Sequence, residues 1–482
     1  MIDIRSVLQV LGWLTCWVGA VLLIPTVADL ANNNIDWEAF LKAAALSLFA
    51  GTTIILATKD GSIADKLNFR QAFLLIVMGW IVVTIFGSVP FLGIGLSFTD
   101  AVFETMSGIT TTGSTVLTGL DTLPPGILLW RAILQWIGGI GIIAIAVLIL
   151  PFLRIGGMQM FKIESSGSQH DKSEFTMKTL ILLTAVYVGL TSICALIYYM
   201  LGMTFFDAAT HAMTTLSTGG YSTHDASFGF FENYSLHWAA TFFMMCGAIP
   251  FFLFVKATLG NVRALVTDQQ VKGFVIFLTC SSIFMAFWLV EQRGIGIFEA
   301  ITLTSFNITS VVTTTGYATD DYTAWGHGAV GMFLVLMFIG GCSGSTSGAI
   351  KIYRYQVLWM FVRSHVRKLF SPNRVIALKY NGTPLGNDVP LSVLAFLAVF
   401  IATISVFTMI LALMDLDIVT AYSASVTAIT NVGPGMGHII GPAGNFQPLP
   451  DAAKWILVCA MLAGRLEVLA LLVLFERDFW VD

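Results

Sequence analysis

Residues 98–115 read FTDAVFETMSGITTTGST, and this stretch decides the fold. It begins with an apolar residue and an acid, continues through a weakly apolar helical part, and ends in a Thr and Ser run that contains a glycine. Similar stretches follow as FFDAATHAMTTLSTGGYS at 205–222, IFEAITLTSFNITSVVTTTGYAT at 297–319 and LDIVTAYSASVTAITNVGPG at 416–435. We align them on Gly113, Gly219, Gly316 and Gly433, which predicts a unit of about 100 residues that occurs four times.

The composition around these stretches is that of a membrane protein. Of 482 residues, 56% are hydrophobic and only 11% are charged, against roughly 25% charged in an ordinary soluble domain. The 24 Lys and Arg and 28 Asp and Glu cannot cover the surface of a soluble chain of this length. A net charge of -4 offers no basic surface for a nucleic acid. Soluble enzymes and nucleic-acid-binding proteins are therefore disfavoured.

Apolar runs long enough to cross about 30 Å of hydrocarbon recur along the whole chain. We mark them at about residues 7–29, 38–58, 70–93, 127–152, 176–201, 236–258, 271–292, 327–362, 389–413 and 452–476. The first two precede the repeats. Each repeat then consists of a span, a segment that re-enters the membrane, and a second span.

Basic residues predict the orientation, because cytoplasmic loops carry an excess of Lys and Arg. With the N-terminus inside, the outer connections hold Arg293 and almost no other positive charge, so both termini are expected in the cytoplasm. The expected cytoplasmic residues are Lys59, Lys66, Arg70, Arg154, Lys162, Lys172, Lys178, Lys256, Arg263, Lys272, Lys351, Arg354, Arg363, Arg367, Lys368, Arg374 and Lys379. All four re-entrant segments then start from the outer side, which favours rotation about an axis along the membrane normal over inverted repeats.

The predicted fold is an all-α polytopic membrane protein. Four pseudo-symmetric repeats of span, re-entrant pore loop and span surround one central pore, and two extra transmembrane helices precede them. The parts are an N-terminal two-helix region at 1–60, then repeats at 61–155, 156–262, 263–380 (with a broken second helix) and 381–482.

Neutral oxygen atoms end each re-entrant segment. Non-helical backbone at membrane depth survives only where it lines a water-filled or ion-filled cavity. Carbonyl and hydroxyl oxygens suit a weakly hydrated monovalent cation, whereas a divalent-selective filter would carry carboxylates. We expect the ion to be bound by Thr111, Thr112, Gly113, Ser217, Thr218, Gly219, Thr314, Thr315, Gly316, Asn431, Val432 and Gly433.

Acidic residues stand near the four segments. Those at the segment starts fit N-caps or first-turn acids of short helices. Together with the remaining outer acids they could also form an electronegative vestibule that concentrates cations. The full set is Asp100, Glu104, Asp121, Asp207, Asp225, Glu232, Glu299, Asp320, Asp321, Asp415 and Asp417.

Together with the stretch GGCSGSTSG at 340–348 and an arginine in the last span, these features resemble the Trk/Ktr/HKT superfamily of potassium transporters. The two extra spans make the TrkH/TrkG branch the closest match. The resemblance implies potassium uptake across a bacterial inner membrane, with potassium as the transported and filter-bound ion and no cofactor. It also implies a homodimer on a cytosolic ring of TrkA-type nucleotide-binding subunits. In related plant proteins a serine at the first filter glycine accompanies sodium transport, so Gly113 favours potassium.

Two intramembrane features predict a gate. The eighth span would be about 50 Å long as one helix, longer than the bilayer core, and its glycine-rich middle favours a break. Arg465 lies near the middle of the last span, where a charge costs at least about 2.5 kcal/mol unless it faces protein or water. The expected gate residues are Gly340, Gly341, Cys342, Ser343, Gly344, Ser345, Thr346, Ser347, Gly348 and Arg465.

Several alternatives stay open. The glycines of 340–348 could serve close helix packing, and Arg465 could pair with Glu467 or with carbonyls of the broken helix. The protein could be a sodium-selective or a proton-coupled or sodium-coupled symporter of the same superfamily. It could also be a non-transporting scaffold or receptor. The six cysteines are interpreted as small core residues.

Overall fold

The computed structural model describes residues 4–58, 68–148, 169–386 and 388–480. The only strands in these ranges, β1 (Lys379–Tyr380) and β2 (Thr383–Pro384), form a short antiparallel hairpin, and most of the remaining chain is helical. Seven of the described helices are long and apolar enough to cross a membrane, or eight if one bent pair is a single span. The predicted all-α, multi-pass architecture is confirmed at this level. The predicted boundaries at 60/61 and 155/156, with Lys59, Lys66, Arg154 and Lys162, lie outside the described residues.

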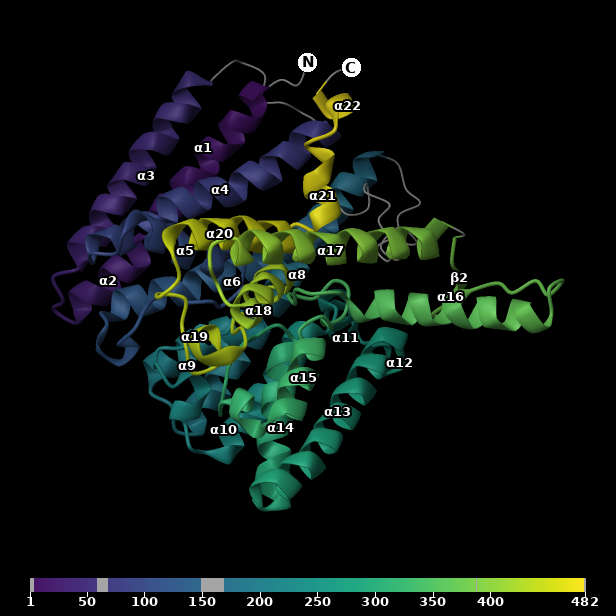
Figure 1. Cartoon of the computed structure of the whole chain (residues 1–482). Helices are drawn as coiled ribbons and strands as arrows, with labels where there is room; N and C mark the ends of the chain where they lie inside the picture. The colour runs from purple at the N-terminus through teal and green to yellow at the C-terminus, as the bar shows by residue number, and fades with distance from the viewer. Residues whose placement is uncertain (1–3, 59–67, 149–168, 387, 481–482) are drawn as a thin grey trace.

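After the first three helices, one order of elements recurs (Figure 1). A long helix leads to a short helix of 12 to 16 residues, then to an extended segment and a further helix. The helices, grouped by this order, are α1 (Ile4–Val21), α2 (Leu23–Ala31) and α3 (Trp37–Ala57); α4 (Phe69–Gly93), α5 (Phe98–Ile109), η1 (Leu120–Thr122) and α6 (Pro125–Leu148); α8 (Gln169–Met200), α9 (Phe205–Leu216), η3 (Ser227–Phe230), α10 (Tyr234–Ala248), α11 (Phe251–Thr258) and α12 (Arg263–Thr267); α13 (Gln269–Arg293), α14 (Ile297–Val312), η4 (Tyr322–Trp325), α15 (His327–Leu336) and α16 (Ile352–Phe370); and α17 (Asp388–Ala412), α18 (Ile418–Thr430), α19 (Gly437–Ile440), α20 (Asp451–Arg465), α21 (Val468–Val473) and α22 (Arg477–Trp480).

Three of the ten predicted spans are interrupted helices. The sixth bends by 96° between α10 and α11, where Pro250 follows an extended Ile249, because the residue before a proline avoids the helical region. The eighth breaks as expected, between α15 and α16, over residues 337–351. The tenth breaks between α20 and α21, where Glu467 has a φ of 62°.

The acids at the starts of the short helices have the expected structural role. Ser97 and Thr204 cap α5 and α9 by accepting the N–H of Asp100 and Asp207, which lie in the first turns. Asp417 itself caps α18. These caps satisfy backbone groups that the helix leaves free, and so they fix where each short helix begins.

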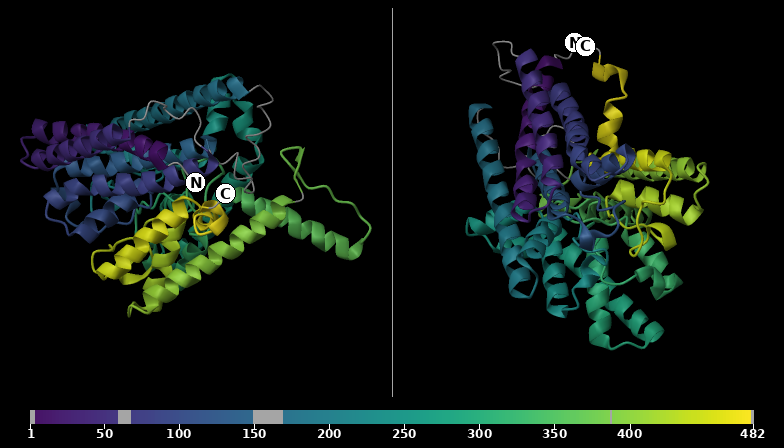
Figure 2. Two further views of the ribbon diagram at one scale, coloured as in Figure 1. Left: turned by 90° about the horizontal axis from the view of Figure 1, so that it is seen from above. Right: turned by 90° about the vertical axis from the view of Figure 1, so that its left-hand side faces the viewer.

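The positions of the two chain ends and of α16 stand out in the arrangement of the helices. The start of α1 and the end of α22 lie at the same end of the molecule (Figure 2), which agrees with termini on one side of a membrane. α16 and the hairpin extend away from the rest of the molecule (Figure 1).

The six cysteines are all free, and apart from the partly buried Cys16 they divide into two groups. Cys194, Cys246 and Cys342 are buried, as predicted. Cys280 and Cys459 are exposed, so their prediction as core residues is wrong. Both lie on exposed faces of apolar helices. In such helices an apolar sequence does not distinguish the exposed face from the buried one.

The N-terminal helices pack through glycine. A methyl group on Gly51 of α3 would lie 2.7 Å from the carbonyl oxygen of Gly12 and 2.6 Å from Cys16 Sγ, both in α1. In α2, Asp29 Oδ1 accepts the N–H of Gly126 at 2.7 Å and thereby joins this region to α6.

We predict that Gly51→Ala lowers the thermal stability of the purified full-length chain, because α1 must move away from α3. Overpacking of this kind costs about 1–3 kcal/mol. Gly189→Ala in α8 is the matched control, since nothing lies within 4 Å of its added methyl group. Thermal unfolding in detergent measures both, and an equal stability of the two variants would contradict the packing described.

Candidate functional site

Each short helix ends in an extended segment with one backbone conformation. We call residues 110–116, 217–223, 313–319 and 430–436 the first to fourth ring segments. In each, a polar residue of positive φ is followed two positions later by a glycine of positive φ. The polar residues are Thr111, Thr218, Thr314 and Asn431, with φ from 52° to 59°, and the glycines are Gly113, Gly220, Gly316 and Gly433, with φ from 79° to 108°.

The four glycines close a ring. A methyl group on Gly113 would collide with Gly219 O, the carbonyl oxygen just before Gly220. A methyl group on Gly220 would collide with Thr315 O, just before Gly316. In the same way, a methyl group on Gly316 would meet Val432 O, just before Gly433. A methyl group on Gly433 would lie 2.7 Å from Thr112 O, just before Gly113, which closes the ring. All these separations are under 3.0 Å, which real Cβ atoms do not reach. Glycine is therefore required at each position for the four segments to meet.

The second segment differs by one residue from the sequence alignment. The conformation and contacts of Gly113 recur at Gly220, not at Gly219. Gly219 instead corresponds to Thr112, because the N–H group of each donates to the carbonyl oxygen of the residue five positions earlier. Two adjacent glycines at 219 and 220 hid this register in the sequence.

The ring offers neutral oxygens. The threonines of the first and third segments at 110–112 and 313–315 are fully buried, as are Ser217, Thr218, Thr430 and Asn431. The ring residues from 110–113, 217–220, 313–316 and 430–433 include no charged side chain. Such a ring can replace part of the water around a monovalent cation.

A buried ion pair braces the first two segments. Arg131 Nε donates to Glu104 Oε1 at 2.8 Å, and its NH1 group donates to Ser222 O at 2.8 Å. The Thr115 hydroxyl also donates to Glu104, and the guanidinium lies 4.0 Å from the centre of the Tyr221 ring. The pair thus connects α5, α6 and both segments.

Sequence reasoning missed Arg131, although the signal was available. It lies inside the predicted span 127–152, and a charge in a span calls for a partner, as it does for Arg465. The expectation that Glu104 contributes to an outer vestibule is wrong, because its side chain is fully buried against Arg131.

Gln135, one turn further along α6, holds the second segment directly. Its Nε2 donates to Gly219 O at 2.7 Å, and its Oε1 accepts the N–H of Tyr221 at 3.0 Å. Tyr221 in turn donates its hydroxyl to Ser114 O at 3.2 Å. One amide side chain thereby fixes the backbone on both sides of Gly220.

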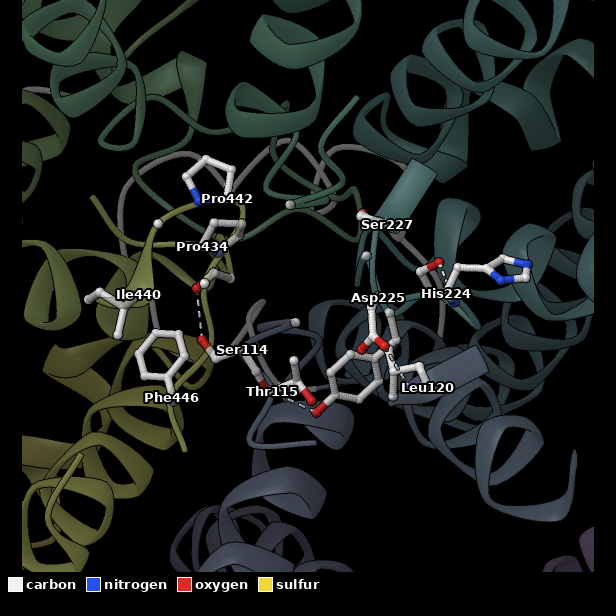
Figure 3. Close-up of a pocket in the computed structure, with 18 of the residues that line it drawn as sticks. Ser114, Thr115, Leu120, His224, Asp225, Ser227, Pro434, Ile440, Pro442 and Phe446 are labelled. Carbon is white, nitrogen blue, oxygen red and sulfur yellow. Dashed lines mark hydrogen bonds between the residues drawn. The ribbon is translucent and has the colours of Figure 1, made fainter. Parts of the chain in front are cut away.

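A cavity opens on one side of the ring, and all four glycines line it (Figure 3). Ser114 and Pro434 lie on one wall, with His224 and Asp225 opposite. The Asp225 carboxylate accepts the N–H of Leu120 at 3.1 Å. The cavity therefore combines a neutral floor with a carboxylate at its edge.

Several acids expected in the vestibule interact with basic side chains of the protein. Asp100 pairs with Lys454, and Asp320 pairs with Arg293, both at 2.6 Å. A hydrogen bond with His224 lowers the pKa of Asp121 below its ordinary value. The vestibule is consequently less negative than the count of acids suggests.

We call the interruption between α15 and α16, residues 337–351, the intramembrane loop after its predicted position. It lies on the other side of the ring. It contacts the first residues of the segments, whereas the cavity is lined by later ones. The Thr346 hydroxyl donates to Leu216 O at 3.1 Å and to Gly247 O at 2.9 Å. The loop backbone also donates from Cys342 to Ala248 O at 2.9 Å.

Arg465 reaches this loop from α20. It is 3% exposed, and its NH1 group donates to Thr346 O at 2.8 Å. Its NH2 group is 3.5 Å from Gly138 O, and its Nε has no hydrogen-bond partner among the described residues. Of the two structural pairings considered, the loop carbonyl is the one observed. Glu467 pairs with Arg354 instead, at 2.8 Å.

Comparisons with known proteins agree with one another. The family described as TrkH, cation transport protein, matches residues 37–480. The Trk system potassium uptake protein TrkI of Halomonas elongata is 44% identical over 478 residues, covering 98% of this chain and 96% of that protein. The Trk system potassium uptake protein TrkH of Escherichia coli is 33% identical over 490 residues, covering 99% of both. The crystal structure of the potassium transporter TrkH from Vibrio parahaemolyticus matches with a TM-score of 0.91 at 31% identity, covering 99% of this chain and 100% of that one.

We predict that Gly220→Ala destabilises the protein more than Gly219→Ala. At Gly220 the methyl group meets backbone and the φ is 79°, which together cost about 2–5 kcal/mol. At Gly219 the three nearest atoms belong to the side chain of Gln135, which can turn aside if it gives up its hydrogen bonds to the segment. Thermal unfolding of both full-length variants is the measurement. If Gly219→Ala lost more thermal stability than Gly220→Ala, the result would favour Gly219 as the ring glycine, as the sequence alignment had it.

Proposed function

The chain belongs to the TrkH family of cation transport proteins, and from this premise we propose that it takes up potassium ions across the bacterial inner membrane. The relatives that it resembles over nearly their whole length are named as potassium uptake proteins, and they are transporters rather than enzymes. The observation that carries the proposal is the closed ring of four neutral, glycine-centred segments.

In the proposal, the ring is a selectivity filter. Potassium is bound by carbonyl and hydroxyl oxygens of the predicted residues at 111–113, 217–219, 314–316 and 431–433. Gly220 joins them because it occupies the place of the other three ring glycines. The short helices α5, α9, α14 and α18 end at the ring, so the negative ends of their dipoles face a passing cation. No side-chain charge holds the ion, which allows it to leave again.

The four groups of elements are proposed as four repeats around one pore. Their boundaries are 61–155, 156–262, 263–380 and 381–482, and the region 1–60 packs outside them. The recurrence of one conformation in four segments supports this division. The order of contacts around the ring supports rotation about a single axis.

The intramembrane loop with Arg465 is proposed as the gate. The loop lies directly against the first residues of three ring segments. Arg465 donates to this loop and adds a positive charge beneath the filter, where it repels cations. Opening would require the loop and Arg465 to move away from the ring together.

Partner subunits are also proposed. The relatives are named as members of Trk systems, and a membrane component of such a system works with other subunits. For this chain we propose a homodimer on a cytosolic ring of TrkA-type nucleotide-binding subunits. Within the basic stretch from Lys351 to Lys379, Arg354 is buried against Glu467. The candidate docking surface and membrane anchor is therefore its exposed part, Arg363, Arg367 and Lys368 on the protruding α16 and Arg374 and Lys379 after it.

A flux assay with the purified chain in vesicles tests the proposed function. We expect potassium uptake that sodium competes with only weakly, and imposed pH and voltage gradients will reveal any coupling. Gly113→Ser should reduce the preference for potassium over sodium by about tenfold, equivalent to about 1.4 kcal/mol, because its side chain enters the ring.

Gly119→Ser is the control for this variant. Gly119 also has a positive φ, of 72°, but it lies in an outer connection, where an added methyl group would meet only Thr122 Oγ1, at an ordinary contact distance of 3.6 Å. It should keep the wild-type preference. An unchanged preference in Gly113→Ser would count against the filter.

Arg465→Ala should raise potassium flux. Removal of the charge lowers the barrier below the filter, and each 1.4 kcal/mol lost from a barrier speeds passage by about tenfold. The flux assay is the measurement, with Arg293→Ala as a control at a partly exposed outer arginine. Equal flux in Arg465→Ala and wild type would remove this arginine from the gate.

A further inference from the structure

Two of the four joints between neighbouring ring segments contain direct hydrogen bonds. Between the first and second, Tyr221 donates to Ser114 O at 3.2 Å. Between the fourth and first, the Ser114 hydroxyl donates to Gly433 O at 2.8 Å. At the joint between the second and third, the link comes from just beyond the second segment, where the Ser227 hydroxyl accepts the N–H of Ala318 at 3.2 Å.

The joint between the third and fourth segments is different. Gly316 lies against Val432 O there, but within the described ranges no hydrogen bond connects 313–319 with 430–436. Packing alone does not fix the distance between two backbones as hydrogen bonds do. This joint therefore lacks both the direct hydrogen bonds of the two joints at the first segment and the Ser227 link of the joint between the second and third.

Two consecutive residues of the intramembrane loop bridge that joint. The N–H of Gly348 donates to Thr314 Oγ1 at 2.7 Å, and the N–H of Ala349 donates to Thr430 O at 2.8 Å. Thr314 belongs to the third segment and Thr430 to the fourth. The loop thus occupies the place of the missing link.

The loop is in turn held from two sides. Thr218 of the second segment donates its hydroxyl to Thr346 Oγ1 at 3.2 Å, and Arg465 donates to Thr346 O at 2.8 Å. Thr111, which has the same conformation as Thr218 and Thr314, has a buried hydroxyl with no hydrogen-bond partner in the described part of the chain. Of these three threonines, Thr111 in the first segment is therefore the one that forms no hydrogen bond with the loop within the described residues.

We infer that the intramembrane loop is the fourth joint of the ring, so that its position sets ion discrimination as well as flux. Thr314 is the positioning residue that transmits the position of the loop to the ring. When the loop moves away, the third and fourth segments lose the only hydrogen-bonded link that the described residues give them, and the ring is free to widen at that joint. This inference rests on the proposed filter and gate.

A double-mutant cycle in vesicles tests it, with the ratio of potassium to sodium uptake as the readout. Thr314→Val removes the acceptor and keeps the branched shape, while Thr314→Ser keeps the hydroxyl. Gly348→Ala pushes the loop away, since its methyl group would collide with Thr430 O. Thr111→Val is the matched control, because it removes a hydroxyl from the same conformation without any loop contact.

We expect Thr314→Val and Gly348→Ala each to reduce the ratio by about tenfold, and the double variant to be no worse than either. Thr314→Ser should keep the wild-type ratio. Whatever Thr111→Val does alone, its effect should multiply with that of Gly348→Ala. Independent, multiplying effects of Thr314→Val and Gly348→Ala would overturn the inference, as would greater flux at an unchanged ratio in Gly348→Ala.

Hydrogen exchange provides a measurement that does not depend on flux. Thr314→Val should speed exchange in peptides covering 346–350 and 427–433 of the full chain, whereas Thr111→Val should not. Unchanged exchange in Thr314→Val overturns the inference. A wild-type chain that carries no potassium overturns the proposed function and this inference with it, while potassium transport with an unaltered ratio in Gly348→Ala overturns this inference alone.

Discussion

A backbone carbonyl or N–H group without a partner is costly in hydrocarbon, and this constraint governs the whole molecule. Four segments leave their helices and run extended through the interior, so their polar groups must find partners within the protein. They do so by meeting around one centre and by using side chains such as Gln135, whose amide satisfies the backbone on both sides of Gly220. The long apolar helices then follow as the wall that keeps lipid away from this centre. Because each segment is in contact with the next, no single repeat could form the ring alone.

Close approach of four backbones excludes side chains at the contact, which explains the glycines, and support must come from outside the ring. Arg131 and Glu104 supply it for the first two segments. A buried ion pair contributes little net stability, because removing both charges from water offsets their attraction, but loss of either partner is strongly destabilising. Such a pair is well suited to hold a position. Its cost also explains why it is placed where α5, α6 and two ring segments all benefit from one guanidinium.

The sequence predicted much of this arrangement, since hydropathy, the positions of the acids and four similar Thr/Gly stretches are all local signals. It predicted the break at 340–348, because poor helix formers are concentrated there. It misplaced the second segment by one residue, since either Gly219 or Gly220 satisfies a one-dimensional alignment and only the contacts of Gly220 distinguish them. It also assigned Glu104 to solvent, because its partner Arg131 is 27 residues away and no periodicity relates the two. Pairing across helices is a property of packing, which a single sequence does not encode locally.

Charge balance inside the molecule points to the same region as the backbone. Among the described residues, the buried basic side chains are Arg131, Arg354, Lys454 and Arg465. The first three pair with carboxylates, whereas Arg465 donates to carbonyl oxygens alone. A buried arginine without a carboxylate depends on those carbonyls to replace its lost hydration. One of them, Thr346 O, belongs to the intramembrane loop, so the loop cannot leave the ring without exposing Arg465 to water or moving it as well. The same peptide segment therefore solvates the charge and bridges the third and fourth ring segments, and the two roles cannot be separated by any motion of the loop as a whole.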